Sequence, residues 1–199
     1  MNSPSREALE GRRSGHGFSR AVGISLLLSA GLASVLVAQA PEGWHLAGSH
    51  PQDYRVGTTD EVRREGRASQ YLASNTRQPE GFGTLMQTIG ADAYRGKRVR
   101  MTGFAKAEAV DSWAGLWMRV DGPDKRSLSF DNMEDRPITG TLDWQPYAIV
   151  LDVPKKSTAV AFGILLAGRG TVYLDDVRLE VVPKAVATTD TMKKPRRQP

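Results

Sequence analysis

The chain has 199 residues, no cysteine and a formal net charge of +5. Without cysteine it can form neither a disulfide nor a zinc–thiolate site, and it offers no thiol nucleophile. The charge belongs to the two ends: residues 41–183 hold 18 basic and 19 acidic residues, a net of −1. We therefore expect no basic surface for nucleic acid on the body of the protein, and no nucleic-acid partner.

Residues 1–40 have the pattern of a targeting segment, either a signal peptide or a membrane anchor. Four arginines precede residues 21–40, which carry no charge and end in Ala-Gln-Ala, a sequence suited to signal peptidase. The apolar stretch is also long enough to span a bilayer as an uncleaved helix. Both alternatives predict an exported body: periplasmic, extracellular or anchored outside the cytoplasmic membrane. The remaining alternative is a buried helix of a cytosolic domain.

Short strands separated by turns are predicted along residues 41–183. An extended stretch at 44–46 and a turn at 48–51 come before a strand at 54–56. Residues 60–67 are mostly charged and are predicted to form a loop. Separators rich in Pro, Gly and Asp delimit the other predicted strands, at residues 68–74, 83–89, 98–107, 114–121, 127–130, 146–153, 159–166 and 171–182.

Alternating apolar and polar residues indicate that one face of each strand is buried. From Tyr147 to Val153 every second residue is apolar, and Tyr173 is expected to share a face with Val177 and Leu179. Eight or nine such strands predict an all-β fold, a two-sheet antiparallel jelly-roll sandwich preceded by a hydrophobic N-terminal helix. The Pro-, Thr- and Lys-rich residues 184–199 are predicted to be a disordered basic tail.

The order of the strand sequences resembles that of the galactose-binding-domain-like jelly rolls. The stretches that carry this resemblance are FGTLMQ, YRGKRVRMTGFAKAEAV, WAGLWMRVDG, DWQPYAIVLDVP and AFGILLAGRGTVYLDDVRLEVV. Among these folds the chain is similar to non-catalytic carbohydrate-binding modules whose last strand ends in aromatic-x-Asp-Asp-Val. It resembles more closely a bacterial module of uncertain ligand found beside the DNA-binding half of transcriptional regulators. The resemblance covers residues 43–182 and implies a galactose-binding-like sandwich.

Asp175 and Asp176 are the first candidates for a site. Neighbouring residues of a strand point to opposite faces, so these carboxylates are not expected to work as an acid–base pair. The resemblance implies that Asp175 helps to hold a structural Ca²⁺, a cation that prefers oxygen ligands. The alternative is that Asp175 caps a loop at the end of its strand without a metal.

Trp113, Trp117 and Trp144 are the second candidates. The even-numbered residues of 114–121 are predicted to face the core, which leaves Trp117 and Arg119 together on the opposite face. A flat aromatic ring beside a guanidinium suits a sugar ring. Phe104 lies outside the core face of its own strand and is predicted to add a wall to this surface.

The loop at residues 130–137 is predicted to form one lip of the binding surface, through Asp131, Asn132 and Arg136. The alternative is that Trp117 is covered by a loop and that residues 131–136 form an internal, ion-paired turn. His45 and His50 have no third metal ligand at a recognisable spacing, so they are expected to be ordinary surface histidines.

We predict an exported, non-catalytic β-sandwich module that binds a carbohydrate or another polar ligand. One alternative is a protein-interaction or sensory domain at the cell envelope, with an envelope protein as partner. Another is a glycan-active enzyme, which requires two carboxylates converging on one concave face. The strands offer no such pair, so no catalytic residue is predicted. An exposed Trp117 favours the binding module, and a buried Trp117 favours the interaction domain.

Overall fold

The computed structural model describes residues 40 and 42–193. All but the last residue of the segment predicted to be a signal peptide or anchor, with its hydrophobic helix, lies outside these residues. The described part contains nine strands and three short 3₁₀ turns. The strands are β1 (His45–Gly48), β2 (Tyr54–Arg64), β3 (Arg67–Ser74), β4 (Phe82–Gly90), β5 (Arg98–Asp121), β6 (Ser127–Asp131), β7 (Ile138–Asp152), β8 (Ala159–Ala167) and β9 (Thr171–Val182).

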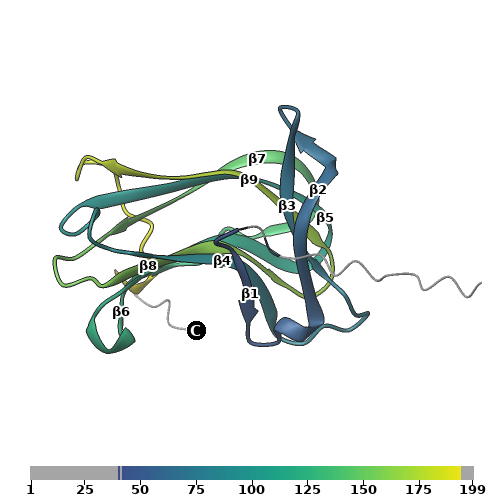
Figure 1. Ribbon diagram of the computed structural model, residues 1–199, viewed down its shortest axis with the longest axis horizontal. Coiled ribbons are helices and arrows are strands. Elements are labelled where there is room, and N and C mark those ends of the chain that lie inside the picture. The colour runs from purple at the N-terminus through teal and green to yellow at the C-terminus, as the bar shows by residue number, and fades with distance from the viewer. Residues whose placement is uncertain (1–39, 41, 194–199) are drawn as a thin grey trace, which may run out of the picture. The chain divides into compact units, whose positions relative to one another are not determined.

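The strands pair antiparallel and curl into two layers (Figure 1). The first sheet has the order β1-β4-β8-β5-β6 and the second sheet has the order β7-β5-β9-β3-β2. β5 belongs to both sheets, because residues 98–108 pair with β9 and residues 113–121 pair with β8. The all-β antiparallel sandwich expected from the sequence is therefore confirmed.

β5 keeps its apolar side toward the core while it passes from one sheet to the other. Its odd-numbered residues are buried up to Ala107, whereas its even-numbered residues face the core from Ala114 onward. Ala109, with a φ of 52°, lies where the pairing with β7 shifts and changes the alternation by one residue, as a β-bulge does. The two strands predicted at 98–107 and 114–121 are consequently one bent strand.

The predicted loop at residues 60–67 is instead the end of a hairpin. β2 and β3 pair as far as Arg64 and Arg67. Glu65 and Gly66 have φ values of 49° and 77°, the left-handed pair that a two-residue hairpin turn requires. This hairpin extends beyond the sheet in Figure 1, so charged residues are tolerated on both of its faces. β7 also begins earlier than predicted, at Ile138 rather than at residue 146.

The core face predicted for β7 is confirmed, and the one predicted for β9 is partly wrong. Ile149 and Leu151 are fully buried. In β9 it is Val172 and Leu174, rather than Tyr173, that lie in the core with Val177 and Leu179 packed against it. Asp176 has a φ of 53° at a register shift against β5, and this bulge moves the alternation by one residue.

Residues 184–193, which composition predicts to be disordered, follow an ordered path. Thr189 bonds to Val150 of β7, and Asp190, only 2% exposed, bonds to Phe130 of β6. Thr and Asp supply little apolar area, but their side chains satisfy backbone groups at strand edges, which a prediction from composition does not consider.

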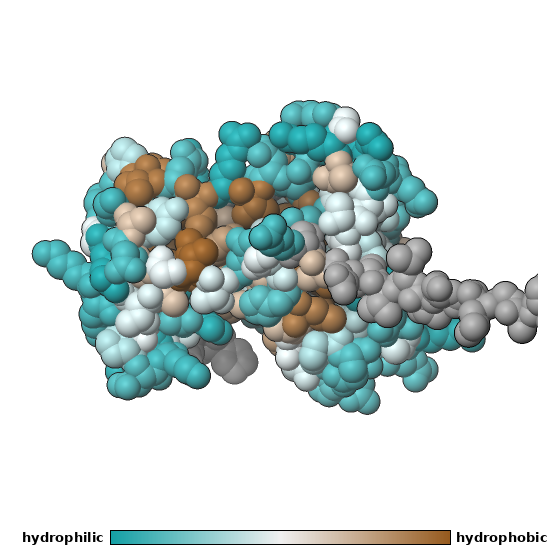
Figure 2. Space-filling model, viewed as in Figure 1, coloured by the Kyte–Doolittle hydropathy of each residue, from teal (hydrophilic) through white to brown (hydrophobic). Residues whose placement is uncertain are grey.

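Apolar side chains gather between the two layers, and polar ones cover much of the outside (Figure 2). Across the described residues, no helix has the length and apolar character needed to cross a membrane.

Candidate functional site

A pocket of about 440 Å³ lies on the outer face of the first sheet, over β4, β5, β6 and β8. Arg119 and Asn132 contribute polar groups to its lining. We call it the aromatic pocket, and its large apolar side chains are Phe82, Met86, Trp113, Trp117, Phe130 and Leu165.

The backbone pattern of β5 and β8 explains why this pocket forms. Trp117 pairs with Gly163 across the sheet, and Gly115 pairs with Leu165. A Cβ at Gly115 would lie 2.8 Å from the carbonyl oxygen of Asn132, so glycine lets the loop after β6 settle against the sheet. A Cβ at Gly163 would lie 2.1 Å from the carbonyl oxygen of Leu85, so this glycine lets β4 approach β8 closely.

Trp117 is buried, with 7% of its surface exposed. Its indole Nε1 donates a hydrogen bond of 2.7 Å to Thr84 Oγ1, and that hydroxyl donates to the carbonyl oxygen of Ile164 at 2.8 Å. The ring is therefore fixed in the floor of the pocket and is no free platform. Because a carbohydrate-binding module was expected to expose Trp117, its burial favours an interaction domain. The partly exposed Trp113 nevertheless offers aromatic surface at the same place.

Arg119 lies at the pocket beside Trp117, as predicted. Its guanidinium Nε and Nη2 donate to the two carboxylate oxygens of Asp121, at 2.8 Å and 3.0 Å. The Arg119 side chain stays 42% exposed, while that of Asp121 is 11% exposed. The bidentate pair orients the guanidinium and leaves part of it open to a ligand.

Asp131 is fully buried and holds the loop after β6. It accepts hydrogen bonds from Arg136 Nη2 at 2.6 Å, from Arg136 Nη1 at 3.2 Å and from the backbone N–H of Met133 at 2.9 Å. Burial acts to lower the pKa of Arg136, but Asp131 and Asp135 outweigh it and the pKa is raised. Asp131 and Arg136 therefore form an internal ion-paired turn rather than a lip for the ligand.

Of the three side chains predicted to form the lip, Asp131, Asn132 and Arg136, Asn132 is the one that lines the pocket. Its Oδ1 accepts a hydrogen bond of 3.3 Å from the backbone N–H of Glu134. The structure thus brings Trp117, Arg119 and Asn132 together in the lining of the pocket, whereas Asp131 is buried and does not line it.

Phe104 does not form a wall of this pocket. It lies on the outer face of the second sheet, where the guanidinium of Arg64 stacks over its ring with 3.4 Å between Cζ and the ring centroid. The prediction treated residues 98–107 and 114–121 as two separate strands that lie beside each other. They are one strand, β5, which passes from the second sheet to the first, so Phe104 and Trp117 lie on opposite outer faces of the sandwich.

The residues around Asp175 do not fit a calcium site. Arg64 Nη1 lies 3.8 Å from Oδ2 of both Asp175 and Asp176, and Arg67 Nη2 lies 3.8 Å from Oδ2 of Asp175. Both carboxylates approach the same guanidinium because the bulge at Asp176 ends the alternation that would have separated them. Two arginines supply the positive charge here, and among residues 40 and 42–193 no three His, Asp or Glu side chains form a metal site.

Four large apolar side chains of the pocket were not predicted from the sequence: Phe82, Met86, Phe130 and Leu165. A signal for them exists in β8, where residues 160–166 are apolar on both faces apart from one glycine. Such a run indicates a strand covered on both sides, rather than one with a solvated outer face.

Comparison with known proteins supports the fold and gives one curated relative. No family model matches the chain. The chain is 47% identical over 150 residues to the uncharacterized HTH-type transcriptional regulator YbfP of Bacillus subtilis (strain 168), an alignment that covers 75% of this chain. It spans about half (51%) of that relative's length. The resemblance to a module found in transcriptional regulators is thereby confirmed.

Solved structures show the same sandwich at low sequence identity. The CBM22-1 xylan-binding domain of Paenibacillus barcinonensis Xyn10C matches with a TM-score of 0.55 and 14% identity, over 75% of this chain and 92% of that one. The CBM22-1–GH10 modules of Clostridium thermocellum xylanase 10B, complexed with xylohexaose, match with a TM-score of 0.51 and 12% identity, over 70% and 26%. The fold is that of carbohydrate-binding modules.

Proposed function

We propose that this chain is a non-catalytic binding module whose aromatic pocket takes a carbohydrate. The observation that carries the proposal is the apolar pocket on an outer sheet face, where a sandwich usually presents polar side chains. Contiguous apolar surface of this kind marks a place where something binds.

The chemistry of the pocket suits a sugar ring. Trp113 and Phe130 offer apolar surface to the C–H face of a ring, and Arg119 and Asn132 offer hydrogen bonds to hydroxyl groups at its edge. The names of two structural neighbours, a xylan-binding domain and a complex with xylohexaose, support the choice of ligand class.

The second candidate is a sensory or protein-interaction domain. This candidate is supported by the 47% sequence identity to a transcriptional regulator and by the burial of Trp117. In this alternative the same pocket receives a side chain of a partner protein or a small effector. The two candidates differ in the molecule that covers Trp113, which is a sugar ring in the first and a protein side chain or small effector in the second.

We also propose that residues 1–40 direct the body out of the cytoplasm, since four arginines precede an uncharged apolar stretch. An exported module would meet glycans of the envelope or the surroundings directly.

The test is titration of the full-length chain with xylohexaose, cellohexaose and other oligosaccharides, followed by tryptophan fluorescence and calorimetry. Trp113→Ala should weaken binding up to about tenfold, because a lost aromatic contact costs about 0.5–1.5 kcal/mol. Trp144→Ala, on the second sheet, is the matched control and should leave the affinity unchanged. If no oligosaccharide binds the unmodified chain, the carbohydrate proposal fails and a protein partner should be sought.

A further inference from the structure

Residues 184–193, which we call the C-terminal strap, cross from the second sheet to the first. The N–H of Thr189 donates to the carbonyl oxygen of Val150 in β7 at 2.9 Å, and its Oγ1 accepts from the N–H of Val150 at 3.0 Å. In β6, the N–H of Phe130 donates to Asp190 Oδ1 at 3.2 Å, and Thr191 Oγ1 donates to the carbonyl oxygen of Phe130 at 2.9 Å.

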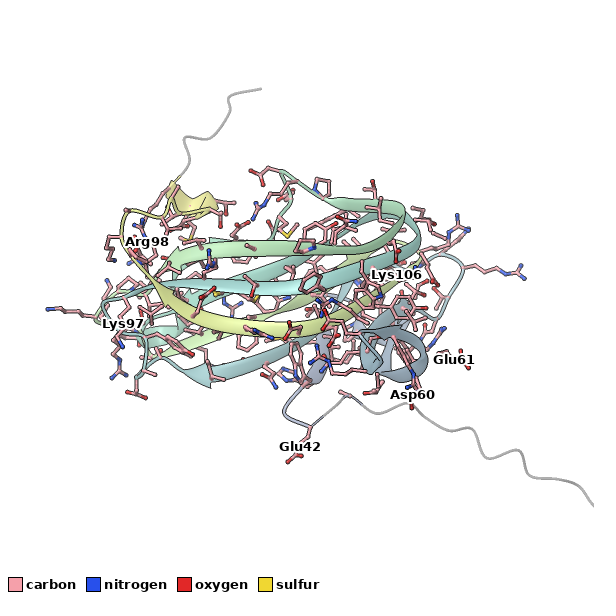
Figure 3. The ribbon with its side chains drawn as sticks, turned by 90° about the horizontal axis from the view of Figure 1, so that it is seen from above. Glu42, Asp60, Glu61, Lys97, Arg98 and Lys106 are labelled. Carbon is pink, nitrogen blue, oxygen red and sulfur yellow. The ribbon has the colours of Figure 1, made fainter. Side chains whose placement is uncertain are left out.

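Both ends of the strap are anchored to one carboxylate. Asp152 accepts from Lys184 Nζ at 2.8 Å and from Lys193 Nζ at 3.2 Å. Arg98 donates to the same carboxylate through Nε and Nη2, and its Nη1 donates to the carbonyl oxygens of Lys184 and Val186. Figure 3 shows Arg98 at the end of the molecule where the strap lies.

Phe130 connects the strap to the aromatic pocket. Its ring packs against the cluster of Trp117, Ala161 and Leu165 and lines the pocket. On one side β6 pairs with β5, where Phe130 faces Arg119. On its other side, the backbone N–H and C=O of Phe130 are both held by the strap, so the strap restrains this short edge strand directly behind a pocket wall.

Asp190 is buried beside Phe130, which deprives its carboxylate of hydration. It is 2% exposed, and its Oδ1 also accepts from the N–H of Met192 at 3.1 Å. A buried carboxylate is unfavourable unless its hydrogen bonds compensate for lost hydration. Here the N–H groups of Phe130 and Met192 both donate to Oδ1, and Lys193 Nζ lies 3.6 Å from Oδ2.

We infer that the C-terminal strap is part of the binding site, and that Asp190 and Thr191 are positioning residues that set the place of Phe130 in the pocket wall. The effect on affinity rests on the proposed function; the effect on Phe130 does not.

The test compares Asp190→Ala and Thr191→Val with the conservative variants Asp190→Asn and Thr191→Ser in the full-length chain. Hydrogen exchange of the Phe130 amide and contacts of its ring with Trp117 are read by NMR, and affinity is read with xylohexaose. The first two variants should weaken xylohexaose binding about three- to tenfold, which is the value of one hydrogen bond, with faster Phe130 exchange. The conservative variants should keep both the xylohexaose affinity and the Phe130 exchange rate of the unmodified chain.

Thr189→Val is the matched control, because it removes a strap hydrogen bond to β7 and leaves both bonds to Phe130. It should keep the affinity and the Phe130 exchange of the unmodified chain. Equal losses of xylohexaose affinity in Thr189→Val and Thr191→Val would overturn the inference, since the strap would then affect only the stability of the protein. If Asp190→Ala fails to fold, Thr191→Val decides.

If the unmodified chain binds no xylohexaose, the carbohydrate proposal loses this support, while the NMR readouts still judge the strap. Unchanged Phe130 exchange and unchanged ring contacts in Thr191→Val would then overturn the inference.

Discussion

The polar side chains around the aromatic pocket are already bonded to other protein groups. Trp117 is bonded to Thr84, Arg119 to Asp121, and Asp131 to Arg136. Side chains fixed in this way lose little conformational entropy when a ligand arrives, so the pocket is preorganised. Trp113 and Phe130 then offer apolar surface on a rigid support.

Asp131→Ala should lower the free energy of unfolding by about 3–5 kcal/mol, because it leaves the Arg136 guanidinium without its buried partner. The reduction is expected at the lower end, since the Arg136 side chain is 34% exposed and water can reach it. Urea denaturation measures the change. Glu134→Ala, an exposed position in the same loop, is the control and should have little effect. A loss of less than about 1 kcal/mol, the size of a neutral hydrogen bond, would show that the pair does not hold this loop.

At the scale of the elements, two β-bulges decide which side chains meet. At Ala109 the alternation of β5 shifts by one residue, so Phe104 and Trp117 both point away from the core although one position is even and the other odd. At Asp176 a bulge brings two neighbouring carboxylates to one guanidinium. Each bulge rests on a non-glycine residue with positive φ, which costs conformational energy. Both occur within strands whose sequences predict regular alternation.

Ala109→Gly should therefore raise the free energy of unfolding by about 0.5–1 kcal/mol, because glycine adopts positive φ without the steric cost of a Cβ. Ala148→Gly, at an exposed position of the regular strand β7, is the matched control and should be destabilising by a similar amount. Thermal unfolding of the two variants gives the comparison. Two destabilised proteins would argue against strain at Ala109.

For the molecule as a whole, the strap joins the edges of the two sheets at β6 and β7. β5 already connects the sheets through the chain, and the strap adds a second connection made of hydrogen bonds and ion pairs. The ion pairs make this second connection sensitive to pH.

Hydrogen bonds from Arg98, and further ones from Lys184 and Lys193, hold the pKa of Asp152 well below its usual range. A carboxyl whose pKa is lowered on folding stabilises the protein above its unfolded pKa, about 3.9, and loses this contribution as the pH falls toward the folded value. The unfolding free energy should thus fall below about pH 4 more steeply than in Asp152→Asn. Asp124→Asn serves as an exposed control. Parallel pH profiles for the unmodified chain and Asp152→Asn would contradict this expectation.

Export is the remaining prediction for the whole chain. Residues 1–40 fused to alkaline phosphatase, which is active only outside the cytoplasm, should give an active enzyme in bacteria. Replacing two leucines of the apolar stretch, Leu27 and Leu28, by arginine should abolish the activity, because charge in that stretch prevents membrane insertion. An inactive fusion with the natural sequence would show that the body stays inside.

The sequence by itself determined the class of fold, most strand positions and the face of Trp117 and Arg119, because these follow from local alternation and turn residues. It did not determine the aromatic pocket, since Phe82, Phe130 and Leu165 come from three strands that only the sheet pairing brings together. The separation of Phe104 from Trp117, the arginines at Asp175 and the ordered strap were likewise decided by tertiary structure. The first depends on the passage of β5 from one sheet to the other, the second on the bulge at Asp176, and the third on the hydrogen-bonding groups of distant strand edges. None of these can be read from the local pattern of side chains.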